Sequence, residues 1–306
     1  MIALEMPQRA SLTVILALLS CLASAAESTP AAPPDLNSIT VHASKDPKRL
    51  KAQIGDYVSA ITKSSRLDSL ARWQVPVCPL VAGVSRAKAE YFLERISQIA
   101  RDAGVPLAPG KCAPNLLIMI TGQPDELLRL WQRRTPHLFS RYRGSTAVQR
   151  FVDSDLPVRA WYNANSSCNG MVTTFSVQSS VLSDSCSMST TGSRLTRNAV
   201  KVVSSVIIVI DKERIKGLTV GQVADYVAML GFFETPEEFE KFDAPSILKL
   251  FADLGVAKPA EMSSWDRAFL KSLYHSNARN VSQAADIGVE IFRDLVAEDV
   301  PEVKAP

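Results

Sequence analysis

The stretch LTVGQVADYVAMLGFFE, residues 218–234, carries the clearest information on the fold of this chain. It follows VVSSVIIVI, residues 202–210, an apolar run typical of a strand buried on both faces of a sheet. Within 218–234 the apolar residues recur at helical spacing, which predicts a helix with a buried face. Thr219 is its expected N-cap, and Gly231 is expected to end it in a left-handed conformation. A central strand is therefore predicted to lead directly into a helix.

This helix resembles the zinc-binding helix of the metzincin proteases, in which a strand leads to the pattern H-E-x-x-H-x-x-G-x-x-H. With Gly231 aligned on the glycine of that pattern, Ala224 and Ala228 stand at the first two histidine positions. Asp225 then stands where the family has its general base, and Glu234 where it has the third ligand. The resemblance implies a zincin-like arrangement around a helix that has lost its metal ligands.

A count of histidines argues against the chemistry of that family. The chain has three, His42, His137 and His275; none lies in the helix, and no two are four residues apart. Alanine cannot bind a metal ion, and one Asp with one Glu does not make a tight zinc site. We therefore expect no metal and no cofactor, and the small alanine side chains should let the helix pack closely against the sheet.

Segments on both sides of the helix keep the order of metzincin elements. Residues 246–248 resemble the Met-turn segment, with Leu248 in place of methionine, and residues 263–274 resemble the closing helix after it. Over about residues 65–276 the chain resembles a family of exported proteobacterial proteins with a degenerate metzincin-like core that lacks the zinc-binding histidines. This resemblance implies an inactive, metalloprotease-like protein.

Hydrophobic periodicity predicts strands and helices along the rest of the chain. Helices are expected at residues 47–63, 86–103, 124–134, 245–254, 264–274 and 281–296, and strands at 115–121 and 158–163. Residues 73–81, with two prolines, are expected to form an edge strand or a strand with a bulge. This order is typical of an α+β fold with a mixed sheet and packed helices. We expect a single domain over residues 39–298, with a helical C-terminal part from about residue 219.

The N-terminus has the features of an export signal. Arg9 precedes the apolar residues 11–23, and Ala23-Ser24-Ala25 fits a cleavage site, so residues 1–25 are a predicted signal peptide. Residues 26–38 are rich in Pro and Ala, which predicts a flexible spacer. No segment after the signal is expected to span a membrane.

An alternative interpretation of the same segment is a lipobox, Leu18-Leu19-Ser20-Cys21, which would make Cys21 a lipidated N-terminus. Both interpretations predict a periplasmic or secreted protein, in the second case held at a membrane by its lipid.

Four cysteines remain after the signal, and an even number in an exported chain favours disulfides. Three pairings can be drawn, and the order along the chain favours Cys78–Cys112 and Cys168–Cys186. The alternative is a set of buried free thiols. No spacing matches C-x-x-C, so a zinc site or a redox dithiol is not expected.

The formal net charge is +3, with both signs interspersed, and this balance argues against nucleic acid as a partner. A basic stretch with interleaved aromatic residues, 135–150, is expected to be a solvated surface loop that includes His137. The alternative for this loop is a site for an acidic polymer or a lipid headgroup.

Two polar groups near the later helices have structural explanations. Ser263 and Asp266 fit a capping box for the helix at 264–274. A Ser246–His275–Asp266 triad can be drawn, but no G-x-S-x-G turn supports it.

Three functions stay open from the sequence. The first is a non-catalytic, metzincin-like envelope protein that binds a peptide, a glycan or a partner protein. The second is a hydrolase with a non-zinc site built on Asp225 and Glu234 as acid and base. Against it, Asp225 is explained as a solvated or hydrogen-bonded helix residue, and Glu234 as the start of an acidic surface run. The third is a lipid-anchored structural protein.

Overall fold

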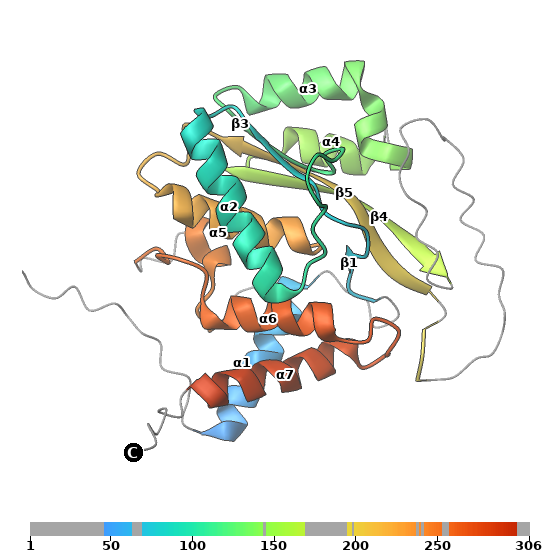
Figure 1. Ribbon diagram of the computed structural model, residues 1–306, viewed down its shortest axis with the longest axis vertical. Coiled ribbons are helices and arrows are strands. Elements are labelled where there is room, and N and C mark those ends of the chain that lie inside the picture. Colours follow the sequence, from blue (N-terminus) through green and yellow to red (C-terminus); the bar gives the residue numbers. More distant parts are fainter. Residues whose placement is uncertain are drawn as a thin grey trace, which may run out of the picture. The chain divides into compact units, whose positions relative to one another are not determined.

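A computed structural model of the chain describes residues 46–62, 69–142, 145–168, 195–197, 199–236, 239, 242–252 and 257–298. These all belong to one compact unit, residues 41–306. Helices pack on a mostly parallel mixed sheet, which confirms the predicted α+β class (Figure 1). Within these ranges no helix is both long and apolar enough to cross a bilayer. The predicted signal peptide, the spacer and Cys21 lie outside the described residues.

The sheet is built around β5 (Ala199–Asp211), the apolar strand that precedes the 218–234 stretch. β1 (Arg72–Trp73) and β3 (Leu116–Thr121) pair with it in parallel, and β2 (Pro79–Ala82) pairs in parallel with β3. β4 (Val158–Cys168) runs antiparallel to β5 over nearly the whole of both strands.

The pairing of β5 decides where β4 lies. Val202 and Val203 pair with β1 and also with β4, so these two strands lie on opposite sides of β5. By the same reasoning Val206 separates β3 from β4. Among the described residues β4 therefore has one strand neighbour and forms an edge of the sheet.

One face of the sheet is covered by α3 (Pro124–Arg134), the 3-10 helix η1 (Pro136–Tyr142) and α4 (Thr146–Asp153) (Figure 1). Trp161 of β4 packs against Phe139 and Phe151 of this layer, with ring centroids 5.7 and 5.6 Å apart. The Asn163 side chain donates a hydrogen bond to the carbonyl of Leu138 at 2.8 Å. Trp161 and Asn163 of β4 thus point toward the layer of η1 and α4.

The other face is covered by α2 (Arg86–Ala103) and α5 (Val220–Phe232), which lie side by side (Figure 1). Beyond them lie α1 (Pro47–Ile61), η2 (Ile247–Phe251), α6 (Ser264–His275) and α7 (Gln283–Glu298). Tyr57 of α1 makes edge-to-face contacts with Trp265 and Phe269 of α6. The main hydrophobic core fills the space between these helices and the sheet.

Local sequence signals explain where most helices begin. The Asp46 side chain accepts from the backbone N–H of Lys48 at 2.9 Å, ahead of Pro47 at the first helical position. Thr219 and Gln222 form a reciprocal capping box at the start of α5, and Ser263 and Asp266 form another at the start of α6. These observations confirm the predicted starts of α1, α5 and α6.

Three predicted elements were wrong in kind or extent. The strand expected at 73–81 is two separate strands, β1 and β2, because the prolines in WQVPVCPLV interrupt the ladder. The basic stretch 135–150 is mostly η1 and α4 rather than a loop, since Phe139 and Val148 are buried and anchor it to the sheet. The helix expected at 245–254 is the short 3-10 helix η2, capped by Ser246.

Gly231 was also predicted wrongly. It does not end α5, which continues to Phe232. Its missing side chain instead allows close packing on the sheet, because a Cβ there would lie 3.3 Å from Leu116 Cδ2 and 3.9 Å from Ile208 Cδ1. Its carbonyl accepts a hydrogen bond from the Trp73 indole at 2.7 Å.

The Cys78–Cys112 disulfide is present, with Cα atoms 6.0 Å apart, which confirms that pairing. It joins the segment before β2 to the segment before β3. Cys186 lies outside the described residues, so the predicted Cys168–Cys186 bond stays a prediction.

Candidate functional site

The two alanines of α5 that were compared with metal-binding positions lie in the core. Ala224 and Ala228 are completely buried in the main hydrophobic cluster. Both alanines therefore face a filled core and not an open cleft. Within the described ranges no group of three or more His, Cys, Asp or Glu side chains is arranged to hold a metal ion.

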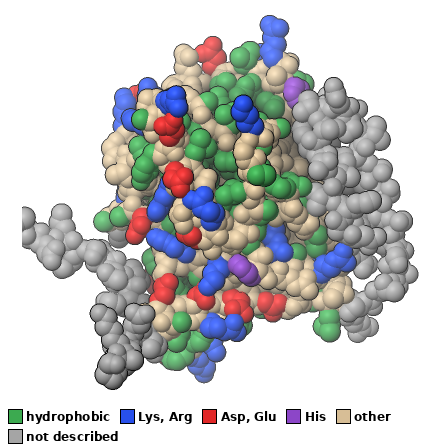
Figure 2. Space-filling model, in the orientation of Figure 1, with side chains coloured by type: hydrophobic (Ala, Val, Ile, Leu, Met, Phe, Trp, Pro, Cys, Tyr) green, Lys and Arg blue, Asp and Glu red, His purple; other side chains and the backbone are tan. Residues whose placement is uncertain are grey.

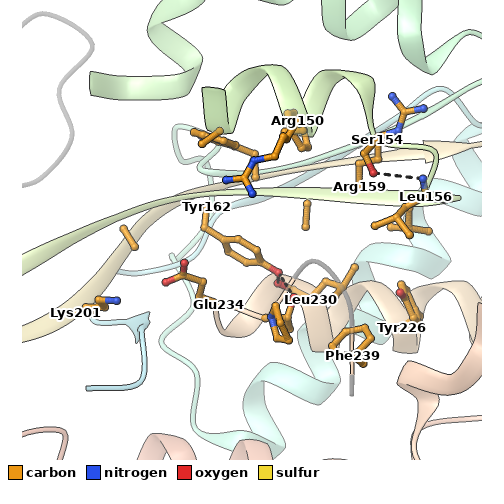
Figure 3. A pocket seen from close by; sticks show the side chains of 18 residues that line it. Arg150, Ser154, Leu156, Arg159, Tyr162, Lys201, Tyr226, Leu230, Glu234 and Phe239 are labelled. Carbon is orange, nitrogen blue, oxygen red and sulfur yellow. Dashed lines mark hydrogen bonds between the residues drawn. The ribbon is translucent and has the colours of Figure 1, made fainter. Parts of the chain in front are cut away.

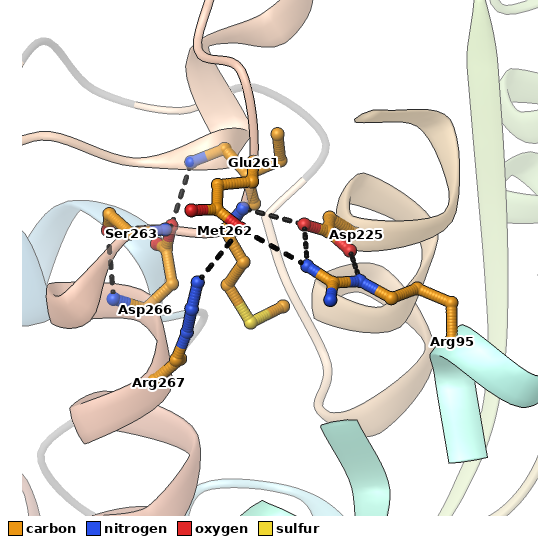
Figure 4. Close-up of polar contacts among 8 residues, drawn as sticks. Arg95, Asp225, Glu261, Met262, Ser263, Asp266 and Arg267 are labelled. Atoms are coloured by element: carbon orange, nitrogen blue, oxygen red, sulfur yellow. Dashed lines mark hydrogen bonds and ion pairs between the residues drawn. The ribbon is translucent and has the colours of Figure 1, made fainter. Parts of the chain in front are cut away.

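Asp225 is fully buried and forms an ion pair with Arg95 of α2 (Figure 4). Arg95 Nε lies 2.6 Å from Oδ1, and its Nη2 lies 2.8 Å from Oδ2. The backbone N–H of Met262 donates to Oδ2 at 2.7 Å. Bidentate, charge-assisted bonds of this kind are strong and directional. Asp225 therefore joins α2, α5 and the segment that leads into α6.

Glu261 extends this ion pair toward the surface. Its carboxylate lies 3.5 Å from Arg95 Nη2 and 3.3 Å from Arg267 Nη2 (Figure 4). The hydrogen bond with Asp225 is the main cause that raises the pKa of Arg95, so the guanidinium stays charged. Both oxygens of Asp225 are thus occupied by permanent donors, which leaves neither as a ready proton acceptor for a substrate.

The proposed acid–base pair of Asp225 and Glu234 is not assembled. Asp225 lies near the start of α5 and Glu234 beyond its end, nine positions later. At 1.5 Å per helical residue, the helical part from Asp225 to Phe232 alone spans about 10 Å along the axis, too far for a shared proton. Glu234 instead lines a separate groove with Tyr162 and Thr235.

A second polar cluster lies under η2 and α6. Asp266 is fully buried and accepts hydrogen bonds from Tyr57 at 2.8 Å and from the Ser246 hydroxyl at 2.6 Å. The backbone N–H of Ile247 donates to it at 2.8 Å. Burial raises the pKa of Asp266 and also that of Tyr57.

This cluster is not a catalytic triad. His275 is exposed at the end of α6, where its Nδ1 is 2.7 Å from the carbonyl of Lys271. The Ser246 hydroxyl has a carboxylate but no imidazole to take its proton. Asp266 also closes the capping box of α6, so the cluster holds η2 and α6 together.

The groove that contains Glu234 has a volume of about 280 Å³ and opens along the edge strand β4 (Figure 3). One wall is α4, with Ala147, Arg150 and Phe151. The other wall is α5 and the segment after it, with lining residues Tyr226, Leu230, Glu234, Thr235, Pro236 and Phe239. Between the walls lie residues 158–162 and Ala164 of β4. The groove therefore follows the strand edge and reaches both faces of the sheet.

Tyr162 fixes the α5 wall. Its hydroxyl lies 2.9 Å from the carbonyl of Leu230 and 2.9 Å from Thr235 Oγ1. Burial raises the pKa of Tyr162, which keeps the phenol neutral as a donor at ordinary pH. The neighbouring Tyr226 stacks edge-to-face on Phe251, with ring centroids 4.8 Å apart. This wall is aromatic and held by hydrogen bonds.

The α4 wall carries an exposed cation, Arg150. Figure 3 shows Arg150 reaching from α4 toward β4, while Tyr162, Leu230 and Phe239 lie on the other side of the strand. Arg159 also lines the groove, but it is buried and binds Asp125 at 2.6 Å and the carbonyl of Val152 at 2.9 Å. On the face shown in Figure 2, cationic and anionic side chains are interspersed, as the balanced composition predicts.

Sequence reasoning missed this groove. The alternation in VRAWYNA, residues 158–164, was a readable signal that β4 uses both of its faces. What it could not reveal was that β4 lies at the edge, since pairing depends on distant residues in β1, β3 and β5.

The chain matches no protein-family model, no curated protein and no solved structure.

Proposed function

We propose that this protein is a non-catalytic binding protein of the cell envelope, and that its ligand is an extended peptide segment that adds to the edge of β4. The observation that carries the proposal is the groove along a strand with one strand neighbour among the described residues. An edge strand presents a row of backbone N–H and C=O groups. An extended peptide satisfies that row with its own backbone, and pockets beside the strand then select its side chains.

The peptide is favoured over a glycan by the geometry of the groove. Its floor is a strand edge, and its α5 wall is built from aromatic and aliphatic side chains such as Tyr226, Leu230 and Phe239. These features match a peptide backbone with apolar side chains. A glycan would need many converging polar side chains, whereas Arg159 and Tyr162 already use their polar groups within the protein.

Two observations support the non-catalytic part of the proposal. Ala224 and Ala228 are packed in the core, and Asp225 is bound on both oxygens. We also infer a zincin-like arrangement of elements. It is supported by the order of an antiparallel edge strand, a central strand and a following helix, β4, β5 and α5.

The envelope location is supported by the Cys78–Cys112 disulfide, since such bonds persist in oxidising compartments. The lipid-anchored alternative depends on Cys21 and is tested by membrane fractionation. Loss of membrane association in Cys21→Ser would favour the anchor, and soluble wild-type protein would exclude it.

Hydrogen exchange with a synthetic peptide of alternating Ser and Val tests the binding mode. We expect slower exchange of backbone amides in residues 158–164 when this peptide is added. Two further versions of this peptide are N-methylated at every second residue, one at the Ser positions and one at the Val positions. One version should lose the effect and the other should keep it, because only alternate amides face β4.

Two variants test whether the peptide binds in the groove. Ala147→Trp fills the groove from α4 and should abolish binding, whereas Thr146→Trp, exposed on the same helix and outside the groove, should not. Unchanged exchange in residues 158–164, or equal binding by both N-methylated peptides, would contradict strand addition.

A further inference from the structure

The charges that line the groove are not equally available to a ligand. Arg159 is committed to Asp125, and Lys201 and Glu234 each have an interaction within the protein. Arg150 is exposed and makes no hydrogen bond or ion pair with any described residue. The accessible uncompensated charge of the groove, within the described ranges, is therefore positive and belongs to the α4 wall.

The two walls receive different side chains of a bound strand. Successive side chains of a strand point to opposite faces, and this holds for a strand added to β4 as it does for β4 itself. In β4, Trp161 and Asn163 point toward α4 and η1, while Tyr162 points toward α5. A paired peptide continues this pleat, so its side chains alternate between Arg150 on one wall and the apolar wall of α5 on the other.

The α5 wall is suited to apolar side chains. Tyr226 is buried and burial raises its pKa, so it stays neutral there. Leu230 and Phe239 add aliphatic and aromatic surface.

We infer that the ligand is a peptide in which acidic and apolar residues alternate, with the acidic side chains toward Arg150 and the apolar ones toward Tyr226, Leu230 and Phe239. The inference rests on the proposed strand addition and specifies the class of peptide. Arg150 is its specificity-determining residue, because a guanidinium and a carboxylate form a charge-assisted, bidentate pair. The order of residues matters as much as their composition, since only alternation places each kind of side chain at its own wall.

Three labelled peptides test this in fluorescence anisotropy at low salt: alternating Asp and Val, alternating Lys and Val, and a block peptide with all Asp before all Val. Wild-type protein should bind the alternating acidic peptide about tenfold more tightly than the basic one, the effect of one well-formed charge pair. The block peptide has the same charge and composition as the first and should bind more weakly.

Arg150→Glu should reverse the preference between the acidic and basic peptides. Arg134→Glu is the matched control, because Arg134 is exposed in the last turn of the neighbouring α3 and lies outside the groove. It should leave the preference unchanged.

The outcomes separate the two proposals. Equal binding of acidic and basic peptides, equal binding of alternating and block peptides, or a preference that survives Arg150→Glu would overturn the charge assignment. Strand addition would then still stand if the uncharged Ser-Val peptide slows exchange in residues 158–164. Failure of that uncharged peptide together with all three charged ones would overturn both.

Discussion

Arg95 of α2 binds both carboxylate oxygens of Asp225 of α5, at 2.6 and 2.8 Å, and so connects the two helices that cover one face of the sheet. Asp225 is fully buried, whereas the Arg95 side chain is 31% exposed. The two partners therefore differ in what their loss leaves behind. Loss of Arg95 leaves a buried carboxylate with one backbone donor, while loss of Asp225 leaves a cation that still reaches Glu261 and water.

Arg95→Ala should lower the free energy of unfolding by about 3 kcal/mol, the cost of leaving a buried charge without its partner. Urea unfolding at neutral pH measures this loss. Arg101→Ala is the control on the same helix: Arg101 pairs with Glu94 at 2.8 Å, but both side chains are at least half exposed. It should cost less than about 1 kcal/mol, and equal losses in the two variants would contradict a buried role for Asp225.

Asp266 should make stability depend on pH. Burial raises its folded pKa above the ordinary value of 3.8. Below pH 3.8 the carboxyl is protonated in both states, so its contribution to stability is fully present. That contribution is lost as pH rises through the raised folded pKa, because folding then opposes ionisation.

Urea unfolding of wild type and Asp266→Asn across this window measures the linkage. The difference in unfolding free energy between the two proteins should change from pH 3.8 up to the raised folded pKa and level off above it, with wild type losing stability relative to the variant. A difference that is constant with pH would show that Asp266 titrates in the folded protein as it does in the unfolded chain.

Two glycines of α5 should respond oppositely to alanine. A Cβ on Gly231 would lie 3.3 Å from Leu116 Cδ2 in the packed core, so Gly231→Ala should destabilise by about 1 kcal/mol. A Cβ on Gly221 would meet the Tyr91 hydroxyl at 3.3 Å, but Tyr91 is exposed and can move. Gly221→Ala should therefore gain up to about 1 kcal/mol of helix propensity. Thermal unfolding compares them, and a stabilising Gly231→Ala would refute close packing of α5 on the sheet.

Removal of the Cys78–Cys112 bond should cost about 4 kcal/mol, since it spans 34 positions of the chain and restricts the unfolded state. The double variant Cys78→Ala/Cys112→Ala measures this loss by urea unfolding. Adding reductant to that variant then tests the second pairing. A further loss of stability would indicate Cys168–Cys186, and no further loss would argue against it.

Most of the local structure was readable from the sequence. Thr219 and Ser263 marked helix starts, because caps depend on residues within one turn. The apolar run of β5 predicted a central strand. The wrong predictions concern residues whose structure depends on contacts with distant parts of the chain. Gly231 has the local features of a residue that ends a helix, but its role is set by packing against Leu116 and Ile208.

The candidate site also has features that the sequence determined and features that only the tertiary structure determined. The sequence by itself determined that α5 lacks histidine ligands, since metal coordination needs particular side chains at particular positions. It left Asp225 and Glu234 as a conceivable pair, which the length of α5 keeps apart, and only the tertiary structure showed that Arg95 binds Asp225. The groove along β4 was decided entirely by tertiary structure. Which strand lies at an edge depends on pairing between segments far apart in the chain, and no local pattern of residues records that.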